Sequence, residues 1–339
     1  MKERIGVLYG GTSHEREVSL ATGRAVLQAL QEKGLDVVGI DVDSSVPRRI
    51  LQERIEVAFM ALHGGWGENG AMQGLLEIYG IPYTGPGILA SALALDKTMT
   101  KKVLRAEGVP TPDWLSVSSA EVSAENLDET AGRIVSTLGL PVILKPSAEG
   151  SSVGIKVVRQ AEEIPDALAY AAGFSGTILV ETFMTGMETT VGVIGNDDPR
   201  ALPVIEIRPK GGLYTYETKY VPGQTEYIIP ARLPEKIYGR VQELALRAFK
   251  AVGCRGVSRI DVFVDENRGP FVLEINTNPG MTATSLLPKA ARATGMEFGD
   301  LLVYLLELAL ETKTGHPGRH CESTHRAEGR NVKVRALDT

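Results

Sequence analysis

Residues 258–276, SRIDVFVDENRGPFVLEIN, contain two runs of alternating apolar and polar residues joined by a short polar segment. Side chains two residues apart on a strand share a face, so this pattern predicts an antiparallel hairpin with one buried face. We place the turn at Asn267-Arg268. In that register, the apolar face holds Ile260, Val262, Val264, Phe271, Leu273 and Ile275.

The opposite face of this hairpin is predicted to be polar. In the same register Asp261 faces Glu274, and Arg259 faces Asn276. Two carboxylates directly opposite each other on a sheet repel, and a divalent cation is one way to offset this repulsion. Oxygen ligands favour Mg²⁺ or Mn²⁺ over Zn²⁺. A solvated polar face with Arg259 as a simple counter-ion is the other interpretation, and the residues alone leave both open.

The first third of the chain alternates apolar runs with helical patterns. Strands are expected at residues 4–11, 36–43 and 57–64, with helices at 17–34 and 71–80. This alternation predicts an α/β domain with a parallel sheet. Ligands of such sheets bind at the carboxyl ends of the strands, which is where the loops GGTSHERE (10–17) and HGGWGENG (63–70) lie.

The middle of the chain begins with an expected single long helix at residues 88–108, followed by the breaker VPTP. It continues with a strand-rich region and with a helix at residues 235–253. The length of 339 residues suggests two or three domains. The net charge of −6 gives no support for nucleic-acid binding.

Two cysteines, Cys254 and Cys321, provide no disulfide framework, which suits a reducing cytoplasm. The longest apolar-rich run, residues 301–310, is shorter than the roughly 20 residues that span a bilayer. We expect residues 312–339 to form a disordered basic tail, with six Lys or Arg against three Asp or Glu. A metal site in the tail is a weaker interpretation, based on His316, His320, Cys321 and His325.

The loop KPSAEGSSVG (145–154) is rich in glycine and serine and has a lysine at its head. It matches neither the P-loop spacing nor the dinucleotide fingerprint G-x-G-x-x-G. Together with the candidate Mg²⁺ site, this loop suggests binding of nucleotide phosphates, because phosphoryl transfer needs cations that spread charge. The lysines that could contribute are Lys97, Lys145 and Lys219.

A series of motifs makes the chain recognisable. In order, they are YGGTSHEREVSL, ALHGGWGENG, YTGP, LDK, PVILKPSAEGSSVG, YETKY, SRIDVFV and LEINTNPGMTATSL. This series, from Arg4 to about Glu311, resembles the D-alanine–D-alanine ligase family of the ATP-grasp superfamily. The resemblance implies a three-domain fold of mixed α/β and α+β class, with a parallel-sheet domain at residues 1–96, a central domain at 97–184 and a metal-binding domain at 185–311.

The resemblance also implies a two-step reaction. ATP phosphorylates the carboxylate of one D-alanine, and the amine of a second D-alanine attacks the acylphosphate. The expected cofactors are two Mg²⁺ or Mn²⁺ ions, and the expected assembly is a homodimer without membrane insertion. The dipeptide serves peptidoglycan synthesis.

By motif, the resemblance assigns nucleotide and metal roles. The metal ligands are Asp261, Glu274 and Asn276, and the phosphates contact Lys97, Lys145 and Lys219. The adenine lies near Glu181, Phe183 and Met184, and the ribose contacts Glu188. The segment GGLYTYETKYVPGQTEY (211–227) is expected to be a mobile lid.

The amino-acid roles follow in the same way. Glu15 grips the ammonium of the first D-alanine and links to Ser151 and Tyr220, while Ser285 and Leu286 hold the second carboxylate. Arg259 and the N–H of Gly280 stabilise the tetrahedral intermediate, and His63 lies beside the substrate. Without the resemblance, Glu15 is equally explained as a helix N-terminal carboxylate, and His63 as a satisfied strand-end histidine.

Three alternatives remain. Tyr220 favours dipeptide synthesis over D-lactate or D-serine as the second substrate. A non-catalytic nucleotide-binding module is expected to have lost Arg259, Asp261 or Glu274, and all three are present. A nicotinamide-dependent oxidoreductase would need the G-x-G-x-x-G spacing, which the loop at residues 10–17 lacks.

Overall fold

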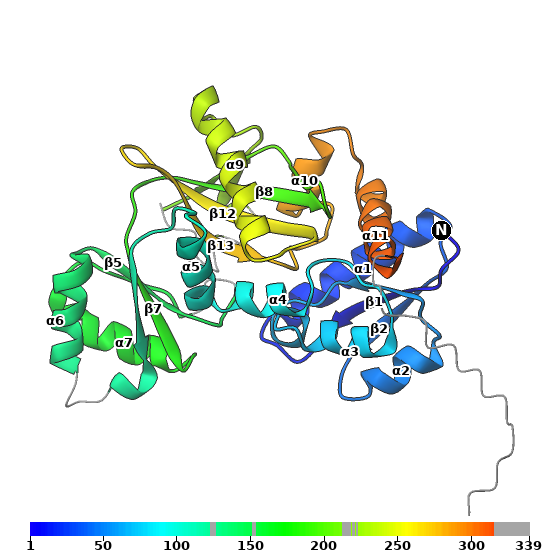
Figure 1. Cartoon of the computed structure of the whole chain (residues 1–339), viewed down its shortest axis with the longest axis horizontal. Helices are drawn as coiled ribbons and strands as arrows, with labels where there is room; N and C mark the ends of the chain where they lie inside the picture. The colour runs from blue at the N-terminus through cyan, green and yellow to red at the C-terminus, as the bar shows by residue number, and fades with distance from the viewer. Residues whose placement is uncertain (123–126, 151–153, 212–217, 219–220, 222, 315–339) are drawn as a thin grey trace, which may run out of the picture.

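Three β-sheets organise the computed structural model, which describes residues 1–122, 127–150, 154–211, 218, 221 and 223–314. The N-terminal sheet and the central sheet lie at opposite ends of an elongated molecule, and the third sheet lies between and above them (Figure 1). The mixture of one parallel and two antiparallel sheets confirms the predicted fold class.

The N-terminal sheet is parallel, in the order β2-β1-β3, as predicted. Its strands are β1 (Ile5–Gly10), β2 (Val37–Val42) and β3 (Val57–Met60), and its helices are α1 (Arg16–Glu32), α2 (Val46–Gln52) and α3 (Ala71–Tyr79). The C-terminal helices α10 (Leu286–Arg292) and α11 (Phe298–Thr314) return to this part of the chain. Side chains of α11, α1 and β3 share one apolar core, so α11 packs against the N-terminal domain.

The central sheet is antiparallel, in the order β4-β7-β5-β6. It contains β4 (Trp114–Ser118), β5 (Val142–Pro146), β6 (Lys156–Val158) and β7 (Thr177–Thr182). Helices α6 (Leu127–Leu138) and α7 (Ile164–Ala172) pack against it through a core that includes Ile134 and Leu168. Since β5 and β6 are antiparallel neighbours, the glycine-rich loop connects the two strands of a hairpin.

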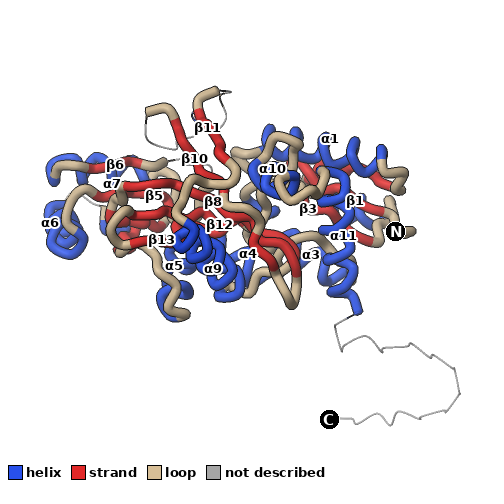
Figure 2. The backbone as a smooth tube through the Cα atoms, turned by 90° about the horizontal axis from the view of Figure 1, so that it is seen from above, coloured by secondary structure: helices blue, strands red, loops and turns tan. Residues whose placement is uncertain are grey.

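The third sheet has the order β11-β10-β8-β12-β13, with β9 beside β8. Its strands are β8 (Gly186–Gly195), β9 (Arg200–Ala201), β10 (Ile205–Pro209), β11 (Thr225–Ile228), β12 (Gly256–Asp265) and β13 (Gly269–Asn276). Helix α9 (Glu235–Ala251) buries Leu244 and Phe249 on one face of this sheet, and the other face is left for the site. Strands β10 and β11 project from the body of the molecule (Figure 2).

The predicted single helix at residues 88–108 is wrong, because the structure divides it into α4 (Ile88–Leu95) and α5 (Lys97–Ala106). Asp96 has extended backbone angles between them, and its Oδ1 accepts a hydrogen bond from Met99 N at 3.1 Å. A second hydrogen bond, from Ser147 Oγ at 2.7 Å, holds the same oxygen. N-capping by Asp96, supported by a residue distant in sequence, outweighs the helical propensity of this stretch.

The 258–276 hairpin forms, but part of its predicted register is wrong. The structure confirms the pairs Arg259–Asn276 and Asp261–Glu274. A bulge after Asp261 then pairs Val262 with Val272. Val272 is therefore the buried residue that faces α9, and the predicted apolar partners Phe271 and Leu273 lie outside this core.

The turn of this hairpin explains the shift. It has three residues, 266–268, because Gly269 pairs with Asp265, whereas the predicted register paired Gly269 with Glu266. Asp265 Oδ1 accepts hydrogen bonds from Asn267 N and Arg268 N at 3.0 and 2.9 Å. Gly269 has φ +90°, which suits the residue that closes a three-residue hairpin loop.

Helix α11 extends to Thr314, so residues 312–314 are helical and do not belong to the expected tail. The rest of the tail lies outside the described residues. Short 3₁₀ turns occur at Gly65–Gly67, Ser119–Glu121 and Ala161–Glu163. Among the described residues, no helix combines the length and apolar character needed to cross a bilayer.

Candidate active site

Two cavities meet at the centre of the molecule. One, of about 1330 Å³, lies between the central and third sheets. The other, of about 790 Å³, lies between the N-terminal loops and the segment from β13 to α10. Both are lined by Lys97, Glu149, Arg259 and Glu274. These four residues therefore lie where a ligand in one cavity would meet a ligand in the other.

The polar face of the β12–β13 hairpin forms the floor of this junction. Arg259 is 7% exposed and Asp261 is 6% exposed. Arg259 Nε and Nη2 donate to the two oxygens of Asp261, at 2.9 and 2.8 Å. Asp261 Oδ1 also accepts a hydrogen bond from Thr190 Oγ1 on β8 at 2.6 Å. The sheet thus fixes both side chains before any ligand binds.

The residues predicted to bind metal fit a hard cation. Asp261 faces Glu274 across the hairpin. Asn276 Oδ1 is buried and has no hydrogen-bond partner among the described residues. A buried oxygen without a partner is costly, and an ion would satisfy it. Within the described part of the chain, no cluster of three His, Cys, Asp or Glu side chains forms a metal site, so this set depends on the amide of Asn276.

Glu188 on β8 adds negative charge to the same region. Burial, followed by the nearby charges of Asp261 and Glu274, raises the pKa of Glu188 to about 8. Glu188 lines the larger cavity only. The charges of Asp261 and Glu274 thus disfavour the ionisation of Glu188, and a bound cation would offset this effect.

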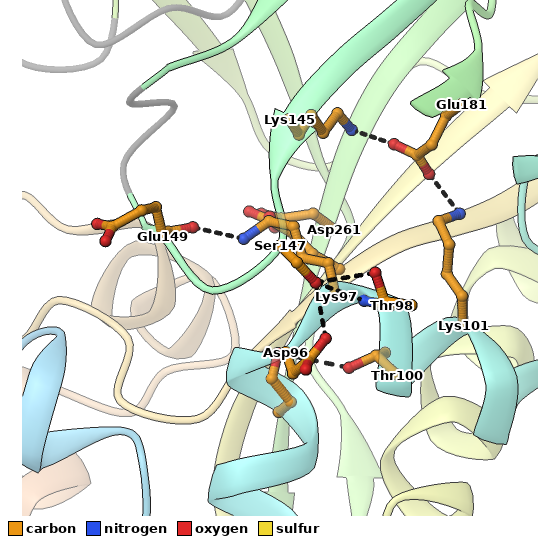
Figure 3. Close-up of polar contacts among 12 residues, drawn as sticks. Asp96, Lys97, Thr98, Thr100, Lys101, Lys145, Ser147, Glu149, Glu181 and Asp261 are labelled. Atoms are coloured by element: carbon orange, nitrogen blue, oxygen red, sulfur yellow. Dashed lines mark hydrogen bonds and ion pairs between the residues drawn. The ribbon is translucent and has the colours of Figure 1, made fainter. Parts of the chain in front are cut away.

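Two of the three predicted phosphate lysines line the larger cavity, and Lys97 also lines the smaller one. Lys97, the first residue of α5, donates from Nζ to the backbone oxygen of Glu149 at 2.6 Å, and it lies 3.6 Å from Glu274 Oε2. Lys145 leaves the end of β5 and pairs with Glu181 Oε2 at 2.5 Å (Figure 3). Burial would lower the pKa of Lys145, but Glu181, Glu274 and Glu188 outweigh burial and raise it.

Ser147 anchors the start of the glycine-rich loop to α5. Its backbone oxygen accepts a hydrogen bond from Lys97 N at 2.9 Å. Its hydroxyl donates to Asp96 Oδ1 and lies 2.9 Å from Thr98 Oγ1. The loop and Lys97 are therefore placed by the same contacts, which the sequence pattern did not reveal.

The larger cavity is also lined by Phe183 and Met184, as expected for a nucleobase site, and by Glu181. The Glu181 side chain, however, is 1% exposed and lies between Lys145 and a second lysine, Lys101. Sequence reasoning missed Lys101. Its position four residues after Lys97 on an amphipathic helix is the signal that could have found it.

The smaller cavity brings the N-terminal loops to the junction. Glu15 lines it and packs closely against two glycines, since a Cβ at Gly150 would lie 2.7 Å from Glu15 Oε2 and one at Gly64 would lie 3.0 Å from it. His63 is buried, and its Nε2 lies 2.9 Å from Thr22 Oγ1. These contacts join the loops at residues 10–17 and 63–70 to the glycine-rich loop.

The opposite wall contains Gly280, Ser285 and Leu286. Ser285 Oγ lies 2.8 Å from Thr282 Oγ1 and accepts a hydrogen bond from Thr282 N at 3.1 Å. A Cβ at Gly280 would lie 3.1 Å from Ser285 Oγ, so the segment passes close to the hydroxyl here. This wall can offer hydroxyl and backbone donors to a carboxylate.

Family models for the D-ala D-ala ligase C-terminus and N-terminus match residues 103–307 and 44–86. The chain belongs to the D-alanine–D-alanine ligase family. It is 50% identical to the D-alanine–D-alanine ligase of Pelotomaculum thermopropionicum, over 92% of this chain and 98% of that protein. It is also 50% identical to the ligase of Desulforudis audaxviator, over 92% of this chain and all of that one.

Solved structures of ligases also have a fold similar to that of this chain. The crystal structure of the Bacillus anthracis enzyme complexed with ATP has a TM-score of 0.78 at 32% identity, and covers 92% of this chain and 99% of that one. The VanG D-Ala:D-Ser ligase of Enterococcus faecalis has a TM-score of 0.77 at 28% identity, covering 91% of this chain and all of the other.

Three residues that the ligase family resemblance assigned lie outside the described residues, namely Ser151, Lys219 and Tyr220. The same holds for most of the predicted lid at residues 211–227. All the other predicted site residues line one or both of the two cavities.

Proposed function

We propose that this enzyme uses ATP to join two D-alanine molecules into D-alanyl-D-alanine for peptidoglycan synthesis, through a D-alanyl phosphate. The observation that carries this proposal is the junction of the two cavities at Lys97, Glu149, Arg259 and Glu274. A phosphoryl group from a nucleotide in one cavity meets a carboxylate from an amino acid in the other there. Positioning of this kind supplies much of the catalysis of phosphoryl transfer.

ATP occupies the larger cavity in this proposal. Phe183 and Met184 contact the adenine with the backbone near Glu181, and Glu188 binds the ribose. Lys97, Lys145 and Lys219 bind the phosphates. The three domains are those predicted, at residues 1–96, 97–184 and 185–311, so that ATP lies between the second and third.

Asp261, Glu274 and Asn276 hold two Mg²⁺ or Mn²⁺ ions. When bound, these ions neutralise charge on the phosphate oxygens. Two observations support this assignment. Asn276 Oδ1 has no hydrogen-bond partner among the described residues, and the charges of Asp261 and Glu274 help to raise the pKa of Glu188.

The first D-alanine is held through its ammonium by Glu15, beside His63, with Ser151 and Tyr220 linked to Glu15. One of its carboxylate oxygens attacks the γ-phosphorus of ATP, the bond to the bridging oxygen breaks, and ADP leaves. The second D-alanine binds through its carboxylate to Ser285 and Leu286.

The second step forms the peptide bond. The neutral amine of the second D-alanine attacks the carbonyl carbon of the acylphosphate. Arg259 and the N–H of Gly280 stabilise the oxyanion of the tetrahedral intermediate, a role that suits a donor already fixed by Asp261. The intermediate collapses, phosphate leaves, and the amine loses a proton.

D-Alanine is the preferred second substrate. The relatives that are about 50% identical over nine-tenths of the chain are named D-alanine–D-alanine ligase, whereas the D-Ala:D-Ser ligase is 28% identical. We also propose that the enzyme is a homodimer and that it is located in the cytoplasm.

The deciding experiment measures phosphate release from ATP and Mg²⁺ with D-alanine, L-alanine, or D-alanine plus D-serine or D-lactate. We expect release with D-alanine alone and D-alanyl-D-alanine as product by mass spectrometry. Absence of release with D-alanine would refute the proposal. If D-alanyl-D-serine or D-alanyl-D-lactate exceeds D-alanyl-D-alanine at equal substrate concentrations, then D-serine or D-lactate is the preferred second substrate.

A further inference from the structure

Lys101 on α5 is a fully buried lysine, with a side chain that is 0% exposed, and it lines neither of the two cavities. Its ammonium pairs with Glu181 Oε1 and donates to Thr111 Oγ1 at 2.6 Å. The backbone oxygen of Pro112 lies 3.3 Å away. Burying an ammonium group is expensive unless it is paired and hydrogen-bonded, so a lysine kept here needs a reason.

Glu181 is shared between two lysines. One of its oxygens faces Lys101 and the other faces Lys145, which lies at the edge of the larger cavity (Figure 3). Burial alone would raise the pKa of Glu181, but the two ammonium groups lower it, and Glu181 remains a carboxylate. Burial lowers the pKa of Lys101, and the charge of Glu181 opposes this shift. With both lysines protonated, the three groups carry one net positive charge, on the side where Lys145 meets the cavity.

Removal of Lys101 would change this balance. Among the described residues, Glu181 would then keep one ion-pair partner, Lys145, and the two would form a neutral pair. The attraction between opposite charges is strong in a buried site, so the Lys145 ammonium would be drawn toward Glu181 and away from an incoming anion. Lys101 prevents this by satisfying half of the carboxylate.

Lys101 also connects this pair to the metal hairpin. Thr111 Oγ1, which accepts from Lys101, donates to Val272 O on β13 at 2.9 Å. Val272 lies at the bulge of the hairpin, two residues before Glu274. The contacts thus run from Lys145 on the central sheet to the strand that carries Glu274 on the third sheet.

We propose that Lys101 is a positioning residue for the nucleotide phosphates: it shares Glu181 with Lys145, keeps the Lys145 ammonium available to the cavity, and joins it to the hairpin of Glu274. This inference rests on the proposed function, since it takes ATP as the occupant of the larger cavity. Lys101 touches neither nucleotide nor amino acid.

The test compares the binding of ATP with that of adenosine, which lacks the phosphates, by calorimetry in excess Mg²⁺ and without D-alanine. Lys101→Met keeps the length of the side chain and removes its charge. We expect it to weaken ATP binding roughly tenfold and to change adenosine binding less than about twofold. Lys102→Met, an exposed neighbour on α5, is the matched control and should bind both ligands as the wild type does.

A second comparison removes the buried Glu181 carboxylate, which Lys101→Met alone leaves with one ammonium partner fewer. If Lys101 acts through Glu181, then Glu181→Gln and the double variant Lys101→Met/Glu181→Gln should bind ATP within about twofold of each other. The inference is wrong if Lys101→Met leaves ATP binding unchanged, if it weakens ATP and adenosine by the same factor, or if the double variant binds ATP tenfold more weakly than Glu181→Gln.

These measurements separate the inference from the proposed function. Phosphate release by the wild type with D-alanine tests the function, whereas the binding comparisons need no turnover. A wild type that binds ATP no more tightly than adenosine would refute the proposed nucleotide site itself.

Discussion

Arg259 and Asp261 form a two-pronged ion pair on one face of β12, with Nε donating to Oδ1 at 2.9 Å and Nη2 donating to Oδ2 at 2.8 Å. The pair is possible because residues two apart on a strand share a face. It fixes the guanidinium beside both cavities while Asp261 also faces Glu274. The group proposed to stabilise the tetrahedral intermediate is therefore held by a residue proposed to bind metal.

Substitution Arg259→Lys should reduce kcat by about 10²–10³-fold, because lysine keeps the charge but loses the planar, two-pronged contact. We expect a smaller change in the KM for ATP. Steady-state phosphate release at saturating D-alanine is the measurement. Arg247→Lys, which alters a surface contact with the Gly108 carbonyl, serves as control. A kcat within threefold of the wild type for Arg259→Lys would contradict the assigned role.

Asn276→Ala should raise the Mg²⁺ or Mn²⁺ concentration needed for half-maximal activity roughly tenfold, since it removes one proposed oxygen ligand. EDTA should abolish phosphate release, and added Mg²⁺ or Mn²⁺ should restore it. In metal-free buffer, the free energy of unfolding should fall by less than about 0.5 kcal/mol, because Asn276 Oδ1 makes no hydrogen bond to the described residues.

The matched control is Asn196→Ala. Asn196 donates to Leu308 O at 3.0 Å and accepts from Gly256 N at 3.1 Å. Its loss should lower the free energy of unfolding by about 1–2 kcal/mol and leave the metal requirement unchanged. Urea unfolding separates the two variants. An Asn276→Ala variant with an unaltered metal requirement would remove Asn276 from the ligand set.

Thr22→Val should raise the KM for D-alanine several-fold with little effect on the KM for ATP. Thr22 Oγ1 lies 2.9 Å from Nε2 of the buried His63, and valine removes this hydrogen bond. Both residues line only the smaller cavity. Thr294→Val, at the end of α10, is the control. Equal increases in both KM values would mean that Thr22 supports the fold and not the amino-acid site.

Acid stability should depend on Asp265. Hydrogen bonds from the Arg268 side chain, followed by those from the backbone, lower the pKa of Asp265 to about 2. A carboxylate with a depressed pKa stabilises the fold above its unfolded value near 4 and loses that contribution as the pH falls toward 2. Asp265→Asn should therefore be less stable than the wild type at pH 6, by on the order of 1 kcal/mol after allowance for solvent screening.

The difference between Asp265→Asn and the wild type should shrink as the pH falls from 5 to 3, measured as the urea midpoint. A difference that stays constant across this range would show that the turn depends on the shape of the side chain and not on its charge.

Local sequence patterns predicted the elements well where one periodicity dominated. The alternation of apolar and polar residues over residues 258–276 predicted the hairpin and the facing pair Asp261–Glu274. It failed beyond Asp261, because the carboxylate of Asp265 favours a three-residue turn and the strands adjust through a bulge. The continuous helix over residues 88–108 failed for a similar reason, since Asp96 gains hydrogen bonds from Met99 N and from the distant Ser147.

The sequence by itself determined the parallel N-terminal sheet, the polar face of the hairpin and, through its ordered motifs, the ligase family. These follow from side-chain periodicity and from residue types that can be read along the chain. Only the tertiary structure decided that two cavities meet at Lys97, Glu149, Arg259 and Glu274, and that Glu181 is shared by Lys101 and Lys145. Such relationships depend on how separate sheets pack, because the charge of a buried lysine has a defined effect only once its partners from other elements are in place.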